Sequence, residues 1–104
     1  MGVDLRLLPI LEVPGVGLPA SILDLDRDSE LFDAIRDSDP LPRPGFRVLG
    51  FGDSDDYDDP LTYIEREKLC RILCLREDKA NDSHRAALAY LMAHTCQSVC
   101  LYWS

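Results

Sequence analysis

Residues 53–59, DSDDYDD, hold the densest concentration of one chemistry in this sequence, because five carboxylates fall within seven positions and no base separates them. Carboxylates this close repel one another, so we expect a solvated loop. Their oxygens suit Ca²⁺. The calcium-binding loop, however, needs glycine and glutamate at its sixth and twelfth positions, where this chain has Asp58 and Ile64. We therefore predict neither a metal nor a cofactor at this run.

The other chemistry open to this run is electrostatic docking onto a basic surface of another protein, with Tyr57 as an aromatic anchor. A second acidic segment, residues 24–39, carries seven acids and two bases, and Asp26 lies at its start. It would extend the same negative surface if both segments lie on one side of the fold. The alternative, solvated charged faces with no partner, stays open. The predicted partner-binding residues are Asp53, Asp55, Asp56, Tyr57, Asp58, Asp59, Asp33, Asp37 and Asp39.

The negative charge is local. The chain has a net charge of −8, and residues 24–39 and 53–59 together carry more negative charge than that, so the remainder is slightly basic. A local field of this sign repels nucleic acid and membrane surfaces and attracts basic proteins. We therefore predict a basic protein partner, no direct contact with nucleic acid and no membrane binding.

Four cysteines form two C-x3-C pairs, Cys70 with Cys74 and Cys96 with Cys100. Paired motifs of this kind resemble those of the small mitochondrial intermembrane-space chaperones, and that resemblance implies two disulfides stapling two helices. The spacing also leaves open a zinc site that uses His94 with Cys96 and the first pair, although the C-x2-C knuckle is absent. The leading interpretation is reduced thiols that act as small apolar side chains.

The two histidines do not form a catalytic pair. His84 and His94 lie near opposite ends of one predicted helix, about 15 Å apart along its axis. We expect His94, near the end of that helix, to complement the negative end of the helix dipole. The chain also lacks a nucleophile elbow, a zinc-protease motif, a phosphate-cradling loop and a dinucleotide fingerprint. We therefore predict that the protein is not an enzyme.

Length and composition set the scale. With 104 residues, 46% of them hydrophobic and 29% charged, we expect one globular domain over residues 1–104. No apolar run approaches the roughly 20 residues that span a bilayer. No basic region precedes an apolar core, so we expect no secretory signal and a cytoplasmic location.

The helices and strands that must position the acidic residues are predicted from the spacing of hydrophobic residues and from the prolines and glycines that interrupt it. Strands are expected over residues 3–9, ended by Pro9, and at 20–25, 48–51, 61–64 and 98–103, with a loop or irregular edge at 10–19. A helix could instead start at Thr62, with Glu65 completing a capping box. Helices are expected from Asp28 or Ser29 to residue 39, over 65–76 and over 83–95, the last capped by Asp82 or Ser83. Residues 40–47 are a proline-rich connector. The order predicts an α+β fold, a small, mainly antiparallel sheet of 3–5 strands covered on one face by about three helices.

Three stretches, MGVDLRLLP, DDPLTYI and RAALAYLMA with the following VCLYW, resemble small uncharacterised acidic proteins of bacterial viruses and prophages. Small acidic proteins of that class are often inhibitors of host defence. They include anti-CRISPR proteins, several of which present nucleic-acid-like negative surfaces. The resemblance implies a phage-type inhibitor and carries no catalytic or binding residue over to this chain.

These observations together predict a non-enzymatic binding or inhibitor protein that docks an acidic, nucleic-acid-mimicking surface onto a basic partner. Two alternatives stay open: an immunity protein against a basic nuclease toxin, and a thiol or metal protein built on the paired cysteines. Phe46, Phe51, Tyr102 and Trp103 would seal a homodimer if they are exposed, or fill the core if they are not.

Overall fold

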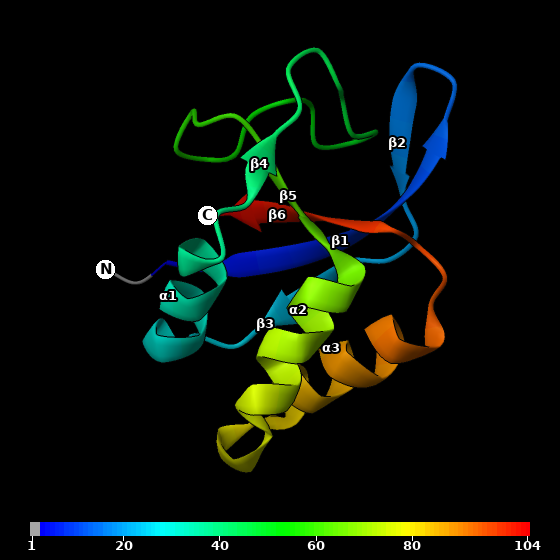
Figure 1. The fold of residues 1–104 in the computed structure, drawn as a ribbon. Coiled ribbons are helices and arrows are strands. Elements are labelled where there is room, and N and C mark those ends of the chain that lie inside the picture. Colours follow the sequence, from blue (N-terminus) through cyan, green and yellow to red (C-terminus); the bar gives the residue numbers. More distant parts are fainter. Residues whose placement is uncertain (1–2) are drawn as a thin grey trace.

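A computed structural model describes residues 3–104 and shows a mixed α and β architecture (Figure 1). Within these residues six strands form one sheet in the order β2-β1-β6-β5-β4, with β3 also paired to β1, and each ladder between them is antiparallel. The predicted α+β class is confirmed, with one strand more than the predicted maximum. The strands are β1 (Leu5–Val13), β2 (Val16–Pro19), β3 (Leu23–Leu25), β4 (Leu41–Pro42), β5 (Thr62–Glu65) and β6 (Ser98–Trp103).

Strand β1 runs straight through Pro9, and residues 10–19 form most of a β-hairpin between β1 and β2. The prediction that Pro9 ends the strand and that 10–19 is a loop or irregular edge is therefore wrong. Pro9 pairs with Val99 of β6, and its carbonyl accepts a 2.8 Å hydrogen bond from the Ala20 backbone on the other side. In an antiparallel strand the N and C=O of one residue point the same way. The missing N–H of Pro9 therefore faces the break between β2 and β3, where no ladder bond is lost.

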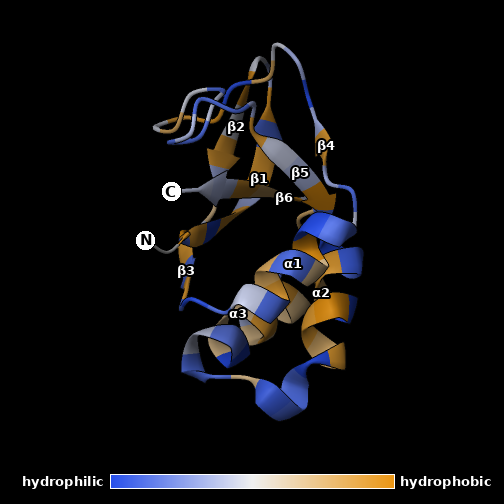
Figure 2. Ribbon diagram, turned by 90° about the vertical axis from the view of Figure 1, so that its left-hand side faces the viewer, coloured by the Kyte–Doolittle hydropathy of each residue, from blue (hydrophilic) through white to orange (hydrophobic). Residues whose placement is uncertain are grey.

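Three helices cover one face of the sheet: α1 (Ser29–Asp37), α2 (Arg66–Leu75) and α3 (Asp82–Ala93), with a short 3-10 turn, η1 (Glu77–Lys79), before α3. Asp28 caps α1, as predicted, by accepting from the Leu31 backbone at 3.1 Å. Asn81, rather than Asp82 or Ser83, caps α3. Figure 2 shows that hydrophobic and hydrophilic residues are mixed along these helices. Their buried side chains join Leu5, Leu7, Ile64, Val99 and Leu101 of the sheet in one core.

The opposite face of the sheet is covered by the irregular segment 43–61 rather than by a helix. Leu8 and Cys100 on that face pack with Val48 and Leu61 in a second, smaller core. The strand predicted at 48–51 is not formed. Val48 makes only isolated bridges, and the chain turns at once to Gly52. The Gly17 backbone bonds to Arg47 and Leu49, so this segment also covers the outer edge of β2.

The four aromatic residues considered for a homodimer are half-buried and pack within the fold. Phe46 contacts Tyr63, Phe51 contacts Tyr102, and Trp103 contacts Phe32, each in an edge-to-face arrangement with centroids 5.2–5.7 Å apart. Such pairs contribute to the core beyond their buried area. The large apolar side chains that are exposed are others, among them Leu41, Leu49, Leu75 and Met92.

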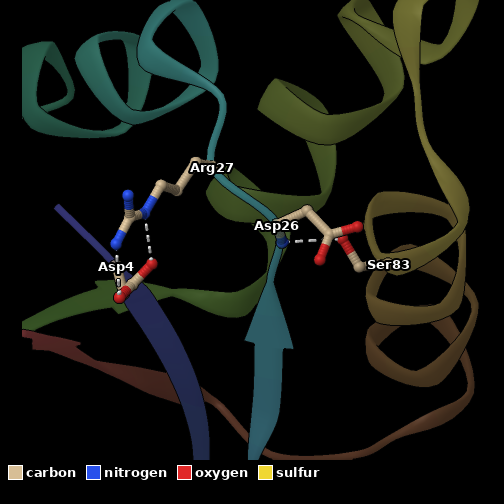
Figure 3. Close-up of polar contacts among 4 residues, drawn as sticks. All are labelled: Asp4, Asp26, Arg27 and Ser83. Carbon is tan, nitrogen blue, oxygen red and sulfur yellow. Dashed lines mark hydrogen bonds and ion pairs between the residues drawn. The ribbon is translucent and has the colours of Figure 1, made fainter. Parts of the chain in front are cut away.

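Two polar contacts hold the connection from β3 to α1 in place. The Arg27 guanidinium contacts the Asp4 carboxylate at 2.9 Å, and the Asp26 backbone donates to the Ser83 hydroxyl of α3 at 2.9 Å (Figure 3). The hydrogen bond from Arg27 holds the pKa of Asp4 below its ordinary value. These two contacts fix the start of α1 relative to β1 and α3.

Replacing Gly17 with alanine is expected to lower the free energy of unfolding by about 1–3 kcal/mol. An added Cβ would lie 2.8 Å from Cε1 of Phe46 and 3.0 Å from Cγ2 of Ile10. Urea unfolding of Gly17→Ala, Phe46→Leu and the double variant measures the effect. The double variant should lose less than the sum of the two single losses, because the smaller leucine relieves the clash. Strict additivity would show that the Phe46 contact is not the cause.

Candidate functional site

The acidic loop, residues 53–59, is held in one shape by its own backbone and by the end of β6. The Leu61 backbone donates to the Asp53 carbonyl at 3.0 Å, and the Asp55 backbone donates to the Asp59 carbonyl at 2.9 Å. Asp58 adopts a positive φ of 62°, which aspartate tolerates better than most residues. Five carboxylates are thus confined to a fixed turn despite their mutual repulsion.

Two further bonds attach the acidic loop to β6. The Asp56 backbone donates to the Trp103 carbonyl at 3.2 Å, and the Tyr102 hydroxyl donates to the Asp56 carboxylate at 2.7 Å. The second bond, and then burial, raise the pKa of Tyr102. The loop is therefore anchored to a strand that crosses the middle of the sheet (Figure 1).

Asp55 lies at the centre of the loop and differs from its neighbours, because only 7% of its surface is exposed. Its Oδ1 accepts hydrogen bonds from the backbones of Tyr57, at 2.8 Å, and Asp59, at 3.1 Å. A side chain that accepts from the backbone two residues later is the bond of an Asx turn. Asp55 therefore organises the loop from inside instead of standing on its exposed surface with the other predicted residues.

The remaining predicted residues of the loop, Asp53, Asp56, Tyr57, Asp58 and Asp59, are exposed. None of the ion pairs formed within residues 3–104 involves a carboxylate of the acidic loop. Arginines and lysines elsewhere do neutralise other acids, as Arg6 does for Asp24 and Arg76 for Glu30. The charge of the loop is thus left for solvent or a partner.

A cavity of about 510 Å³ lies between the acidic loop and the end of α1. Arg36 stacks over the Trp103 ring, with its Cζ 4.4 Å from the ring centroid. The cavity therefore combines apolar walls, carboxylates and one guanidinium. It is lined by Val3, Arg36, Pro40, Pro42, Asp55, Tyr57, Asp59, Pro60, Thr62 and Trp103.

The predicted residues of α1 join this site only in part. Asp33 is exposed, pairs with Arg36 at 3.5 Å and lines a smaller neighbouring cavity that shares Arg36 with the first. Asp37 and Asp39 are exposed at the C-terminal end of α1 and do not line the larger cavity. Asp39 has a φ of 56°, so the chain turns sharply there.

Trp103 and Arg36 were not among the predicted site residues. The alternation of β6 was available from the sequence and places Trp103 on the same face as Val99 and Leu101. The sequence did not show that the acidic loop lies against the end of this strand. By residue type Asp55 does not differ from its neighbours in the run, so the sequence carries no signal for its inward turn.

The four cysteines are free thiols that differ in burial. Cys74 is exposed and Cys70 half-buried on α2, whereas Cys96 and Cys100 are buried. Burial raises the pKa of Cys70 and Cys96, and raises the pKa of Cys100 to about 12. Across residues 3–104 no three histidine, cysteine or acidic side chains converge in a way that suits a metal ion.

The histidines lie apart, as predicted, and the expectation that concerned His94 is not met. His84 is buried, and its Nε2 lies 2.9 Å from the Leu73 carbonyl near the end of α2. His94 follows α3, stacks on Tyr90 and accepts the Cys96 backbone N–H at Nδ1. A ring nitrogen that accepts carries no proton, so this geometry is that of a neutral acceptor and not of a cation at the helix end.

Within the described part of the chain, none of the helices has the length and apolar character needed to cross a bilayer. Comparison with known proteins found no protein-family model, no curated protein and no solved structure that matches this chain.

Proposed function

We propose that this chain is a non-enzymatic binding protein whose acidic loop docks onto a basic surface of another protein and blocks access to it. The observation that carries the proposal is the rigid, unpaired charge of the loop. Its carboxylates are confined by backbone bonds, by Asp55 and by Tyr102, and no basic side chain within residues 3–104 pairs with them.

Holding like charges together costs free energy, and a flexible loop would relax the repulsion by spreading. A fixed array of carboxylates favours association with a basic surface in two ways. It attracts the partner over a distance of about 8 Å at physiological ionic strength, and it loses little conformational freedom on binding. Grooves that bind nucleic acid are basic and suit such an array. An inhibitor of host defence and an immunity protein against a basic nuclease would both use this chemistry.

The experiment compares two variants of equal charge. The loop variant carries Asp53→Asn, Asp58→Asn and Asp59→Asn. Of these side chains only Asp53 makes a bond within the loop, a 3.3 Å hydrogen bond from the Ser54 hydroxyl that the asparagine oxygen can also accept. The control variant carries Glu67→Gln, Asp78→Asn and Asp82→Asn, which are exposed on the helical side. Protamine, an arginine-rich basic protein, serves as the probe in calorimetric titrations at low and at physiological salt.

The loop variant is expected to bind protamine about tenfold more weakly than the wild-type protein, the sum of three exposed charge pairs. The control variant should lose much less affinity for protamine. Added salt should reduce the difference in protamine affinity between the loop variant and the control variant. Equal weakening by both variants would show that only the total charge matters, and the proposed docking site would then be wrong.

A further inference from the structure

We propose that the cavity beside Trp103 receives an arginine side chain of the basic partner, with Asp55 as the counter-ion at its wall. The inference rests on the proposed function and names the chemical group that the site selects. Two features of the cavity support it. One is a buried aspartate with no cation beside it, and the other is an aromatic wall on which a guanidinium is already stacked.

The first feature is Asp55. An aspartate with only 7% of its surface exposed normally has its carboxylate paired with a positive charge or a metal. No arginine, lysine or histidine nitrogen among residues 3–104 lies within ion-pair distance of it. Its two hydrogen bonds both end on Oδ1, and the residue lines the cavity. The cavity therefore has an anionic wall with capacity for a further donor.

The second feature is the wall formed by Trp103 and the prolines Pro40, Pro42 and Pro60. Flat apolar surfaces of this kind suit the methylene stem and the planar, weakly hydrated guanidinium of arginine better than the compact, strongly hydrated ammonium of lysine. The position of Arg36, 4.4 Å from the centre of the Trp103 ring, demonstrates that a guanidinium stacks there. A volume of about 510 Å³ leaves room for a second one.

Arg36 itself does not close the cavity. Its side chain is about half exposed, and its ion pair with Asp33 is long, at 3.5 Å. A movement of Arg36 toward Asp33 would shorten this ion pair and weaken the contact with the Trp103 ring, and both contacts contribute only modest free energy at an exposed site. Asp59, which also lines the cavity, is exposed and adds a second carboxylate at its rim.

Trp103 is the only tryptophan of the chain, so its fluorescence reports on this cavity alone. The test titrates the full chain with blocked tetra-arginine and tetra-lysine peptides of equal charge. The wild-type protein should bind the arginine peptide with a saturable change in emission and about fivefold more tightly than the lysine peptide. Asp55→Asn should remove most of that preference, because the amide oxygen keeps both backbone bonds while the charge is lost.

Thermal unfolding of Asp55→Asn verifies that it is folded, and Asp59→Asn, whose side chain makes no bond within the loop, is a second cavity variant. Asp24→Asn, on β3, is the matched control and should keep the arginine preference. Equal affinity for both peptides, unchanged by Asp55→Asn and Asp59→Asn, would overturn the arginine pocket. If the loop variant still weakened binding of protamine in that case, the proposed docking function would stand without the pocket.

Discussion

Replacing Asp55 with alanine is expected to lower the free energy of unfolding by about 3 kcal/mol, because two backbone donors lose a charged acceptor. The bonds at stake come from the Tyr57 and Asp59 backbones, at 2.8 and 3.1 Å. Asp55→Asn keeps an oxygen in the same place and removes one like charge from the loop. It should therefore change stability by less than about 1 kcal/mol.

Urea unfolding of both variants measures the two free energies, and hydrogen exchange locates the cause. The amides of Tyr57 and Asp59 should exchange much faster in Asp55→Ala and remain protected in Asp55→Asn. If the two variants were equally destabilised, the negative charge of Asp55 and not its hydrogen bonds would hold the loop.

Raising the pH above 9 is expected to remove about 4 kcal/mol of stability by pH 12 through Cys100 alone. This thiol is fully buried on β6, and burial raises its pKa from the ordinary 9.0 to about 12 in the folded protein. Because the folded pKa is higher than the unfolded one, its contribution is complete below pH 9. It is lost as the pH rises toward 12, since the unfolded thiol ionises first. Tyr63, whose pKa burial also raises, acts in the same direction.

The measurement is urea unfolding under reducing conditions at several pH values between 8 and 11, for the wild-type protein, Cys100→Ala and Cys74→Ala. Cys74 is exposed, so its variant should follow the wild-type slope. Cys100→Ala should lose stability less steeply with pH, although it starts lower because a buried atom has been removed. Parallel slopes for all three proteins would show that Cys100 is not the group responsible.

The helices could be predicted because their signals are local. Leu31, Phe32 and Ile35 recur at helical spacing behind the Asp28 cap, and the structure buries all three. The course of β1 could not be predicted in the same way. Whether a proline ends a strand depends on which neighbour its nitrogen faces. That is fixed by pairing with β6, some ninety residues away, and with the segment around Ala20, and neither pairing is visible in the local pattern.

The sequence could predict the charge of the candidate site but not its shape. The run at residues 53–59 is evident from the sequence, and the structure leaves most of its carboxylates exposed and unpaired within residues 3–104. Asp55 looks identical to its neighbours by residue type, and only the turn of the backbone directs it inward. The cavity requires Trp103 and Arg36 to meet across α1 and β6, and no local pattern encodes that contact.

The outer edges of β2 and β4 limit how another protein can be recognised. The backbone of β2 at Gly17 is already bonded to Arg47 and Leu49, and β4 has two residues among closely spaced prolines. A strand of a partner, or of a second copy, therefore finds no long row of free N–H and C=O groups at either place. Extension of the sheet into aggregates is discouraged there for the same reason. Recognition at these borders must therefore depend on side chains and not on shared β-structure.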